Sequence, residues 1–147
     1  MFVVDTNVLV YAANSACPEH AACRSLLERT RPRPLPWYTT WGILYEFLRV
    51  STHPRVFTQP WSIDQAWDFV AGLLASPSLG VLVETPRHAG IAARLLGDVP
   101  AMKGNLLHDA HTAVLMLEHG IRRIYTRDTD FHRFPSIEVL DPLGESE

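Results

Sequence analysis

The chain has 147 residues, a formal net charge of −3 and a hydrophobic content of 47%. This length and apolar content suit one globular domain, 1–147, with a substantial core. Proteins that hold nucleic acid by overall charge are normally basic, so any nucleic-acid binding here must depend on a local site. No apolar run approaches the roughly 18 residues of a membrane span, the first strand follows Met1 directly, and two cysteines provide no disulfide framework. We therefore expect a cytoplasmic protein.

Short apolar runs alternate along the chain with amphipathic segments of helical length. In chain order, the pattern predicts a strand at 2–4, helices at 8–13 and 18–30, a strand at 35–38, helices at 41–50 and 62–75, a strand at 80–83, helices at 86–96 and 105–119, a strand at 122–126, a turn or short helix at 131–134 and a strand at 137–140. The expected helix ends are the N-caps Thr39 or Thr40, Ser62 and Asn105 and the C-terminal Gly120. This alternation indicates an α/β fold with a doubly wound parallel sheet.

The first strand runs directly into Asp5. In open α/β sheets, ligands bind in the crevice outside the carboxyl ends of the strands, so Asp5 is a candidate site residue. The structural alternative is that Asp5 or Thr6 only caps the following helix.

A late strand repeats this pattern, because Ile124-Tyr125-Thr126 leads to Asp128 and Asp130. Ordinary turn chemistry is the alternative explanation for these two acids. Because parallel strands end at the same edge of a sheet, we expect Asp128 to lie close to the acid that follows the first strand.

Two further acids lie on helices. Asp109 is near the start of the 105–119 helix and on its apolar face, so it points inward at the same edge, whereas Glu118 can lie toward the surface. Glu46 lies in the middle of the 41–50 helix, which is apolar nearly all round and is therefore expected to be largely buried. An ion pair with Arg49 is the structural alternative for Glu46.

Clustered carboxylates repel one another unless a cation lies between them. An oxygen-only ligand set, with no His or Cys at ligand spacing, favours Mg²⁺ or Mn²⁺ over zinc. Such sites mainly perform phosphoryl chemistry, and the chain has neither a phosphate-binding Gly-rich loop nor a Walker lysine. The remaining substrate class is a phosphodiester, that is, nucleic acid. His108, His111 and His132 lie near the acidic motifs but are assigned no catalytic role.

Taken together, these motifs resemble a PIN domain. They are Asp-Thr-Asn-Val-Leu-Val at 5–10, Glu46 in its apolar helix, His-Asp-Ala at 108–110 and Thr-Arg-Asp-Thr-Asp-Phe at 126–131. The segment 109–143 is especially similar to VapC-type toxins of bacterial toxin–antitoxin pairs, and the resemblance spans the whole chain. It implies a three-layer α/β/α fold with strand order 3-2-1-4-5, Mg²⁺- or Mn²⁺-dependent ribonuclease activity, a homodimer and inhibition by a VapB-type antitoxin.

The resemblance also implies roles for individual residues. The family's acidic quartet is matched by Asp5, Glu46, Asp109 and Asp128, with Asp130 as an additional acid. The small polar residues that hold the quartet in place are matched by Thr6, Asn7 and Thr126. We expect the cation ligands to be Asp5, Asp109, Asp128 and Asp130. Glu46 either completes the ligand set or orients the attacking water, and Arg49 and Arg127 are candidate phosphate contacts, with salt bridges as the alternative.

Three rival functions remain open. The first is a PIN-domain RNA-processing nuclease without an antitoxin, and the second is a non-catalytic protein-interaction module on the same scaffold. The third is a phosphatase or phospho-receiver of similar topology, which would need a second acid two residues after the first, or an acidic pair, and a lysine near a late strand. Position 7 is Asn, and Lys103, the only lysine, precedes a helix, so the sequence favours the nuclease.

Overall fold

The structure is a computed structural model that describes residues 1–32 and 34–144. Five parallel strands form one sheet in the order β3-β2-β1-β4-β5. The strands are β1 (Val3–Val4), β2 (Trp37–Thr40), β3 (Leu79–Leu82), β4 (Arg123–Tyr125) and β5 (Glu138–Leu140). The short, fully buried β1 lies at the centre, as expected for a strand covered on both faces. The predicted strand order is confirmed.

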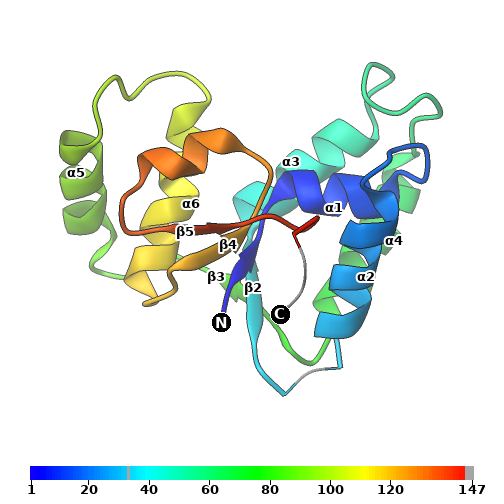
Figure 1. The fold of residues 1–147 in the computed structure, drawn as a ribbon, viewed down its shortest axis with the longest axis horizontal. Coiled ribbons are helices and arrows are strands. Elements are labelled where there is room, and N and C mark those ends of the chain that lie inside the picture. Colours follow the sequence, from blue (N-terminus) through cyan, green and yellow to red (C-terminus); the bar gives the residue numbers. More distant parts are fainter. Residues whose placement is uncertain (33, 145–147) are drawn as a thin grey trace.

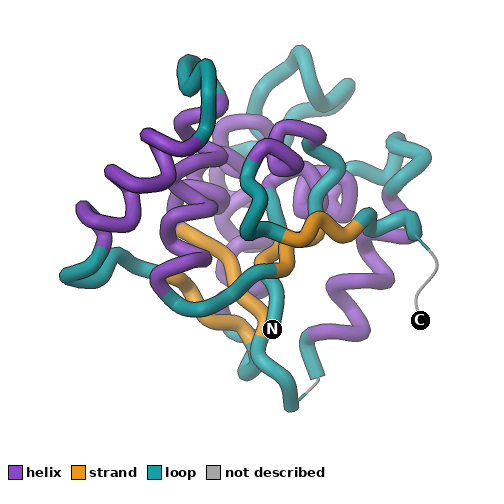
Figure 2. The backbone as a smooth tube through the Cα atoms, turned by 60° about the vertical axis from the view of Figure 1, so that its left-hand side comes forward, coloured by secondary structure: helices purple, strands orange, loops and turns teal. Residues whose placement is uncertain are grey.

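Helices cover both faces of this sheet. They are α1 (Thr6–Ala13), α2 (His20–Thr30), α3 (Trp41–Ser51), α4 (Ile63–Leu74), α5 (His88–Asp98), α6 (Leu106–Glu118) and the 3₁₀ helix η1 (Thr129–Arg133). Figure 1 shows α5 and α6 on one side of the sheet and α1, α2 and α4 on the other. The turned view in Figure 2 shows the strands running between these helical layers. The expected three-layer α/β/α arrangement is therefore present.

Side-chain caps fix where several helices begin. The Thr40 hydroxyl accepts a hydrogen bond from the backbone N–H of Ile43, and Ser62 forms a reciprocal capping box with Gln65. The cap predicted at Asn105 is wrong, because the Asn105 side chain forms no capping hydrogen bond. The backbone of Asn105 has helical angles instead of the extended angles of a capping residue. Gly120 ends α6 with φ +69°, a conformation that favours glycine.

The second strand begins two residues later than predicted. Pro36 has no backbone N–H to give to a neighbouring strand, and the pairing starts at Trp37, whose N–H donates to the Ser78 carbonyl at 3.0 Å. Trp37 is fully buried, together with Phe47, Phe131 and Phe134, and these are the largest fully buried side chains among the described residues. None of the helices within residues 1–32 and 34–144 combines the length and apolar character that a membrane span requires.

Glu118 is buried and not at the surface, contrary to the prediction. Its side chain has no exposed surface, because α5 and the segment that follows β3 cover this end of α6. Glu118 Oε1 accepts hydrogen bonds from the Thr85 N–H (2.8 Å) and hydroxyl (2.6 Å), and Oε2 lies 2.6 Å from His88 Nδ1. The carboxylate thus joins the segment after β3, α5 and α6.

Candidate active site

The carboxyl ends of β1 and β4 bring the first site residues together. These strands are parallel neighbours, and the Asp5 N–H continues their pairing by donating to the Tyr125 carbonyl at 3.1 Å. Asp5 therefore leaves the sheet beside the segment that contains Asp128. This arrangement confirms that the two strand ends deliver acids to the same edge.

A cavity of about 750 Å³ opens at this edge. Its walls come from α1, α3, α6 and the segment around η1, four elements that are distant in the sequence. Of the predicted site residues, the cavity lining contains Asp5, Thr6, Asn7, Glu46, Arg49, Asp109, Asp128 and Asp130. Thr126 and Arg127 are not among the lining residues.

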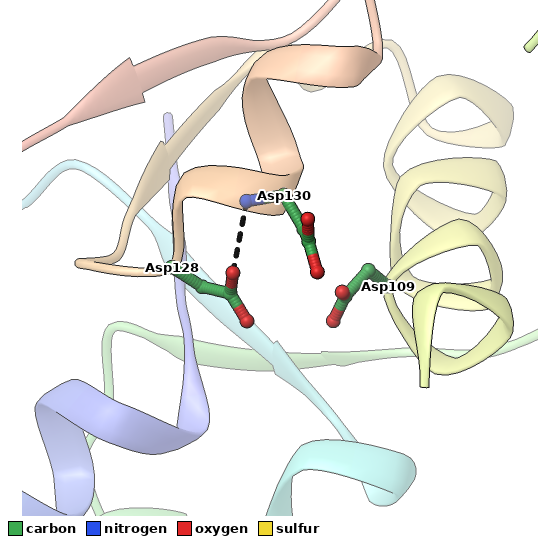
Figure 3. A group of neighbouring side chains, drawn as sticks. All are labelled: Asp109, Asp128 and Asp130. Carbon is green, nitrogen blue, oxygen red and sulfur yellow. Dashed lines mark hydrogen bonds between the residues drawn. The ribbon is translucent and has the colours of Figure 1, made fainter. Parts of the chain in front are cut away.

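Three acids form a group that can hold a cation. One carboxylate oxygen from each of Asp109, Asp128 and Asp130 lies within 4.8 Å of the others. Figure 3 shows the Asp109 carboxylate directed from α6 toward the other two. The Asp130 N–H donates to Asp128 Oδ1 at 2.9 Å and fixes the turn that presents both acids. An all-oxygen set of this kind suits a hard divalent cation.

Asp5 lies on the same cavity but does not belong to that group of three described acids. Both of its oxygens already accept hydrogen bonds, Oδ1 from the Thr6 N–H (2.7 Å) and Oδ2 from Thr126 Oγ1 (2.7 Å) and Asn7 Nδ2 (3.0 Å). Burial raises the pKa of the Asp5 carboxyl, although these hydrogen bonds oppose the change. The residue caps α1, as the structural alternative expects, and it also borders the cavity.

Thr126 and Asn7 connect the acids beneath the cavity. Thr126 Oγ1 donates to Asp5 and accepts from Asn7 Nδ2 and from the Asp128 N–H, both at 2.9 Å. Asn7 Oδ1 in turn accepts from the Arg127 N–H at 3.1 Å. This network agrees with the supporting roles predicted for the two residues. Thr6 differs, because its hydroxyl contacts the Ile43 carbonyl of α3 at 3.4 Å.

The Asp109 carboxyl has a strongly raised pKa. Partial burial raises its pKa to about 7, and the negative charges of Asp128, Asp5 and Asp130 add to this effect. A carboxyl with this pKa is partly protonated at neutral pH. Like charges placed at one site contribute to this rise in pKa, and a bound cation would offset their contribution.

Glu46 and the two predicted arginines occupy different settings. Arg49 holds Glu46 through two hydrogen bonds of 2.6 and 2.9 Å at the cavity wall, and these bonds lower the pKa of the Glu46 carboxyl. The Arg127 guanidinium instead contacts Glu19 at 3.0 Å and Asp141 at 3.7 Å. Both arginines therefore form the salt bridges considered as the alternative to phosphate contacts, and of the two only Arg49 lines the cavity.

The exposed face of α3 departs from the prediction of a largely buried helix. Tyr45 is 67% exposed and Trp41 is 40% exposed, and Tyr45 borders the open cavity and not the core. The cavity lining also includes His108, His111 and Tyr45, to which sequence analysis gave no role. Their proximity to the acidic motifs was visible in the sequence, but the packing of α3 beside α6 was not.

Comparisons with known proteins agree with this geometry. The PIN domain family matches residues 2–137. Ribonuclease VapC43 of Mycobacterium tuberculosis is 40% identical over 143 residues, covering 97% of this chain and 96% of the relative. Ribonuclease VapC48 of the same organism is 33% identical over 140 residues, covering 95% and 96%.

Solved structures show the same fold. The crystal structure of M. tuberculosis VapC20, described as a sarcin–ricin loop cleaving toxin, has a TM-score of 0.66 at 21% identity and covers 90% of this chain and 93% of that one. A VapBC2 structure from Rickettsia felis, bound to a DNA fragment of its promoter, has a TM-score of 0.67 at 17% identity and covers 95% and 96%. At these identities the likeness concerns the fold alone.

Proposed function

This chain belongs to the PIN domain family and, with its relatives, to the VapC ribonucleases, and on this premise we propose that it cleaves RNA phosphodiester bonds in the acidic cavity with a bound Mg²⁺ or Mn²⁺. The observation that carries the proposal is the convergence of Asp109, Asp128 and Asp130, with oxygens within 4.8 Å of one another, on a cavity that Asp5 and Glu46 also line.

The donor set fits a hard cation. Its members are carboxylates without a thiolate among them, which favours magnesium or manganese over softer metals. Burial, and then the negative charges of Asp128, Asp5 and Asp130, raise the pKa of Asp109, and a bound cation would offset both effects. We assign the cation to Asp109, Asp128 and Asp130, with Asp5 completing the ligand set. When bound, the cation supplies an activated water and neutralises charge that develops on the phosphate.

The remaining residues position the substrate and the attacking water. Glu46 faces the cavity and is held in one orientation by Arg49, so it is placed to orient a water in the cavity. Arg49, which is exposed beside it, is placed to contact a backbone phosphate. Thr126 and Asn7 keep the Asp5 and Asp128 segments in register.

The reaction is a hydrolysis. Water oxygen forms a bond to phosphorus while the bond from phosphorus to the 3′ oxygen breaks. One water proton is accepted in the cavity, and the leaving 3′ oxygen takes up a proton. The products are a 5′-phosphate and a 3′-hydroxyl. Positioning and charge stabilisation account for the catalysis, as in other phosphoryl transfers.

We further propose that the protein acts in the cytoplasm, where RNA is accessible, as a homodimeric toxin held inactive by a VapB-type antitoxin. Several structural neighbours are toxin–antitoxin complexes, among them VapBC-1 of nontypeable Haemophilus influenzae. Co-expression with the small gene adjacent to this one tests the partner. A stable complex that cleaves no RNA is expected, whereas failure of any neighbouring product to bind or inhibit would favour an RNA-processing nuclease without an antitoxin.

The ribonuclease function is tested by cleavage of total bacterial RNA with Mg²⁺ or Mn²⁺, followed by mapping of the cut ends. The native chain should produce discrete 5′-phosphate ends that disappear with EDTA. Asp128→Asn should reduce the rate by at least about 100-fold, because it removes a cation ligand. Asp68→Asn, which changes an exposed acid on α4 outside the cavity, is the matched control and should cut at the native rate. Equal rates for the native and Asp128→Asn proteins would refute the assignment.

A further inference from the structure

One wall of the cavity contains a histidine whose two ring nitrogens are in different environments. His111 lies on α6, two residues after Asp109, and lines the cavity. Its Nε2 lies 3.0 Å from Oε1 of Glu84, in the segment that follows β3. Its Nδ1 lies on the side of Gly42, where a Cβ placed on the glycine would be 3.9 Å away. Gly42 also lines the cavity, so Nδ1 lies at the cavity wall, between α6 and α3.

Two contacts fix the orientation of this ring. The first is the hydrogen bond to Glu84, and the second is an edge-to-face contact with the His88 ring, at 5.6 Å between centroids and 76° between planes. His88 is itself held by the fully buried Glu118 carboxylate at 2.6 Å. Although His111 is partly exposed, its ring is therefore oriented by neighbours on two sides.

The hydrogen-bond partner at Nε2 determines whether Nδ1 of His111 can accept a hydrogen bond. A carboxylate only accepts hydrogen bonds, so the shared proton lies on Nε2 of His111. In the neutral imidazole, Nδ1 is then an acceptor. Within the described part of the chain, no side chain or backbone group is recorded as its hydrogen-bond partner. The cavity wall thus presents an oriented acceptor close to the acids that hold the cation.

Such an acceptor distinguishes RNA from DNA. Backbone phosphates and ring oxygens only accept hydrogen bonds, whereas the ribose 2′-hydroxyl can donate one and is absent from DNA. We propose that Nδ1 of His111 accepts a hydrogen bond from the 2′-hydroxyl of a ribose next to the cleaved bond, and that the Glu84–His111 pair thereby makes the nuclease specific for RNA. This inference rests on the proposed ribonuclease function and adds the group by which the sugar is recognised.

Two substitutions separate this role from a merely structural one. His111→Phe keeps a ring of similar size but has no acceptor. His111→Asn keeps an acceptor oxygen bonded to Cγ, the atom to which Nδ1 is bonded in histidine. The proposal therefore predicts that the asparagine variant retains sugar discrimination and the phenylalanine variant loses it.

The substrate for the test is a labelled RNA oligonucleotide that spans a cleavage site mapped in total RNA. A series of copies carries a single 2′-deoxy substitution at each of three nucleotides on either side of the cut. With the native chain, substitution at one position should lower kcat/KM about tenfold, the effect of one lost hydrogen bond. With His111→Phe, the all-ribose substrate should fall to that lower rate, and the same deoxy substitution should then have no further effect.

Three results of this experiment would count against the account. If the deoxy substitution lowers the rate equally in the native and His111→Phe proteins, the 2′-hydroxyl meets another group and the proposal is overturned. It is also overturned if no single deoxy substitution affects the native chain. If the native chain cuts no RNA at all, the ribonuclease function itself fails, an outcome distinct from the loss of sugar discrimination.

Two controls exclude indirect effects. His119→Phe changes a histidine at the C-terminal end of α6, whose Nε2 contacts the Val83 carbonyl and which does not line the cavity, and it should leave the deoxy effect at about tenfold. Binding of Mn²⁺, measured by calorimetry, should be the same for the native and His111→Phe proteins. A weakened Mn²⁺ affinity in His111→Phe would show that the substitution disturbs the acidic group, and would overturn the sugar-recognition role.

Discussion

Replacing Asp109 with asparagine should stabilise the cation-free protein. Partial burial, with the charges of the neighbouring acids, raises the pKa of Asp109 from 3.8 to about 7. Each pH unit between the two values corresponds to about 1.4 kcal/mol, which gives about 4 kcal/mol for a group fully shielded from water. Asp109 is only half-buried, and solvent screening reduces such energies strongly. We therefore expect Asp109→Asn to raise the free energy of unfolding by about 2 kcal/mol at pH 8.

The sign of the pH dependence follows from the same pKa. Between about pH 4 and pH 7 the folded chain keeps a proton on Asp109 that the unfolded chain has lost, so this group makes the native protein less stable as the pH rises. The asparagine variant has no such titration. The stability difference between variant and native chain should therefore be small near pH 4, about 1 kcal/mol at pH 5 and largest above pH 7.

Urea unfolding in EDTA at pH 5 and pH 8 measures this difference, with Asp68→Asn as the control for loss of an exposed acid. Addition of Mn²⁺ should reverse the order at pH 8, because a ligand at 100 times its dissociation constant stabilises the native chain by about 2.7 kcal/mol and the variant binds it less well. A variant that is less stable than the native chain at pH 8 in EDTA, or a difference that is equal at both pH values, would refute this reasoning.

Three other substitutions test separate parts of the account. Glu46→Gln should reduce RNA cleavage at least about tenfold while leaving Mn²⁺ affinity nearly unchanged in calorimetry, because we assign the cation to Asp5, Asp109, Asp128 and Asp130 and the water to Glu46. Thr126→Val should lower the free energy of unfolding in urea by about 2 kcal/mol and should also reduce the rate of RNA cleavage, because the buried Asp5 carboxylate loses its shortest side-chain hydrogen bond. A fully active variant would contradict this role of Thr126. Glu118→Ala should cost about 3 kcal/mol in urea unfolding, since Thr85 and its neighbours lose their partner, yet the folded variant should bind Mn²⁺ with the native affinity, because Glu118 does not line the cavity.

The main features of the site follow from the sequence because they depend on strand ends. Asp5 and Asp128 each come shortly after an apolar run, and parallel pairing of β1 with β4 is sufficient to bring them to one edge. Asp109 was placed by helical periodicity, which depends only on the spacing of apolar residues along α6. These inferences need no knowledge of which elements pack together.

The rest of the site depends on packing between distant segments. The sequence predicts a surface position for Glu118, although Glu118 lies one helical turn after the buried Val114. Its burial depends on Thr85, a hydrogen-bond partner that is 33 residues away in the sequence. The apolar sequence of α3 indicated burial, but Tyr45 faces a cavity that exists only when α3 and α6 lie side by side. For the same reason, the pairing of His111 with a carboxylate that follows β3 could not be read from one sequence.

The central claim is that acids from distant segments hold one divalent cation. Crystals of the native chain soaked in Mn²⁺ and measured for anomalous scattering test it most directly. We expect a single strong peak, or two within about 4 Å, bounded by the carboxylates of Asp109, Asp128 and Asp130. A manganese peak outside this cavity, with none between the three acids, would contradict the account.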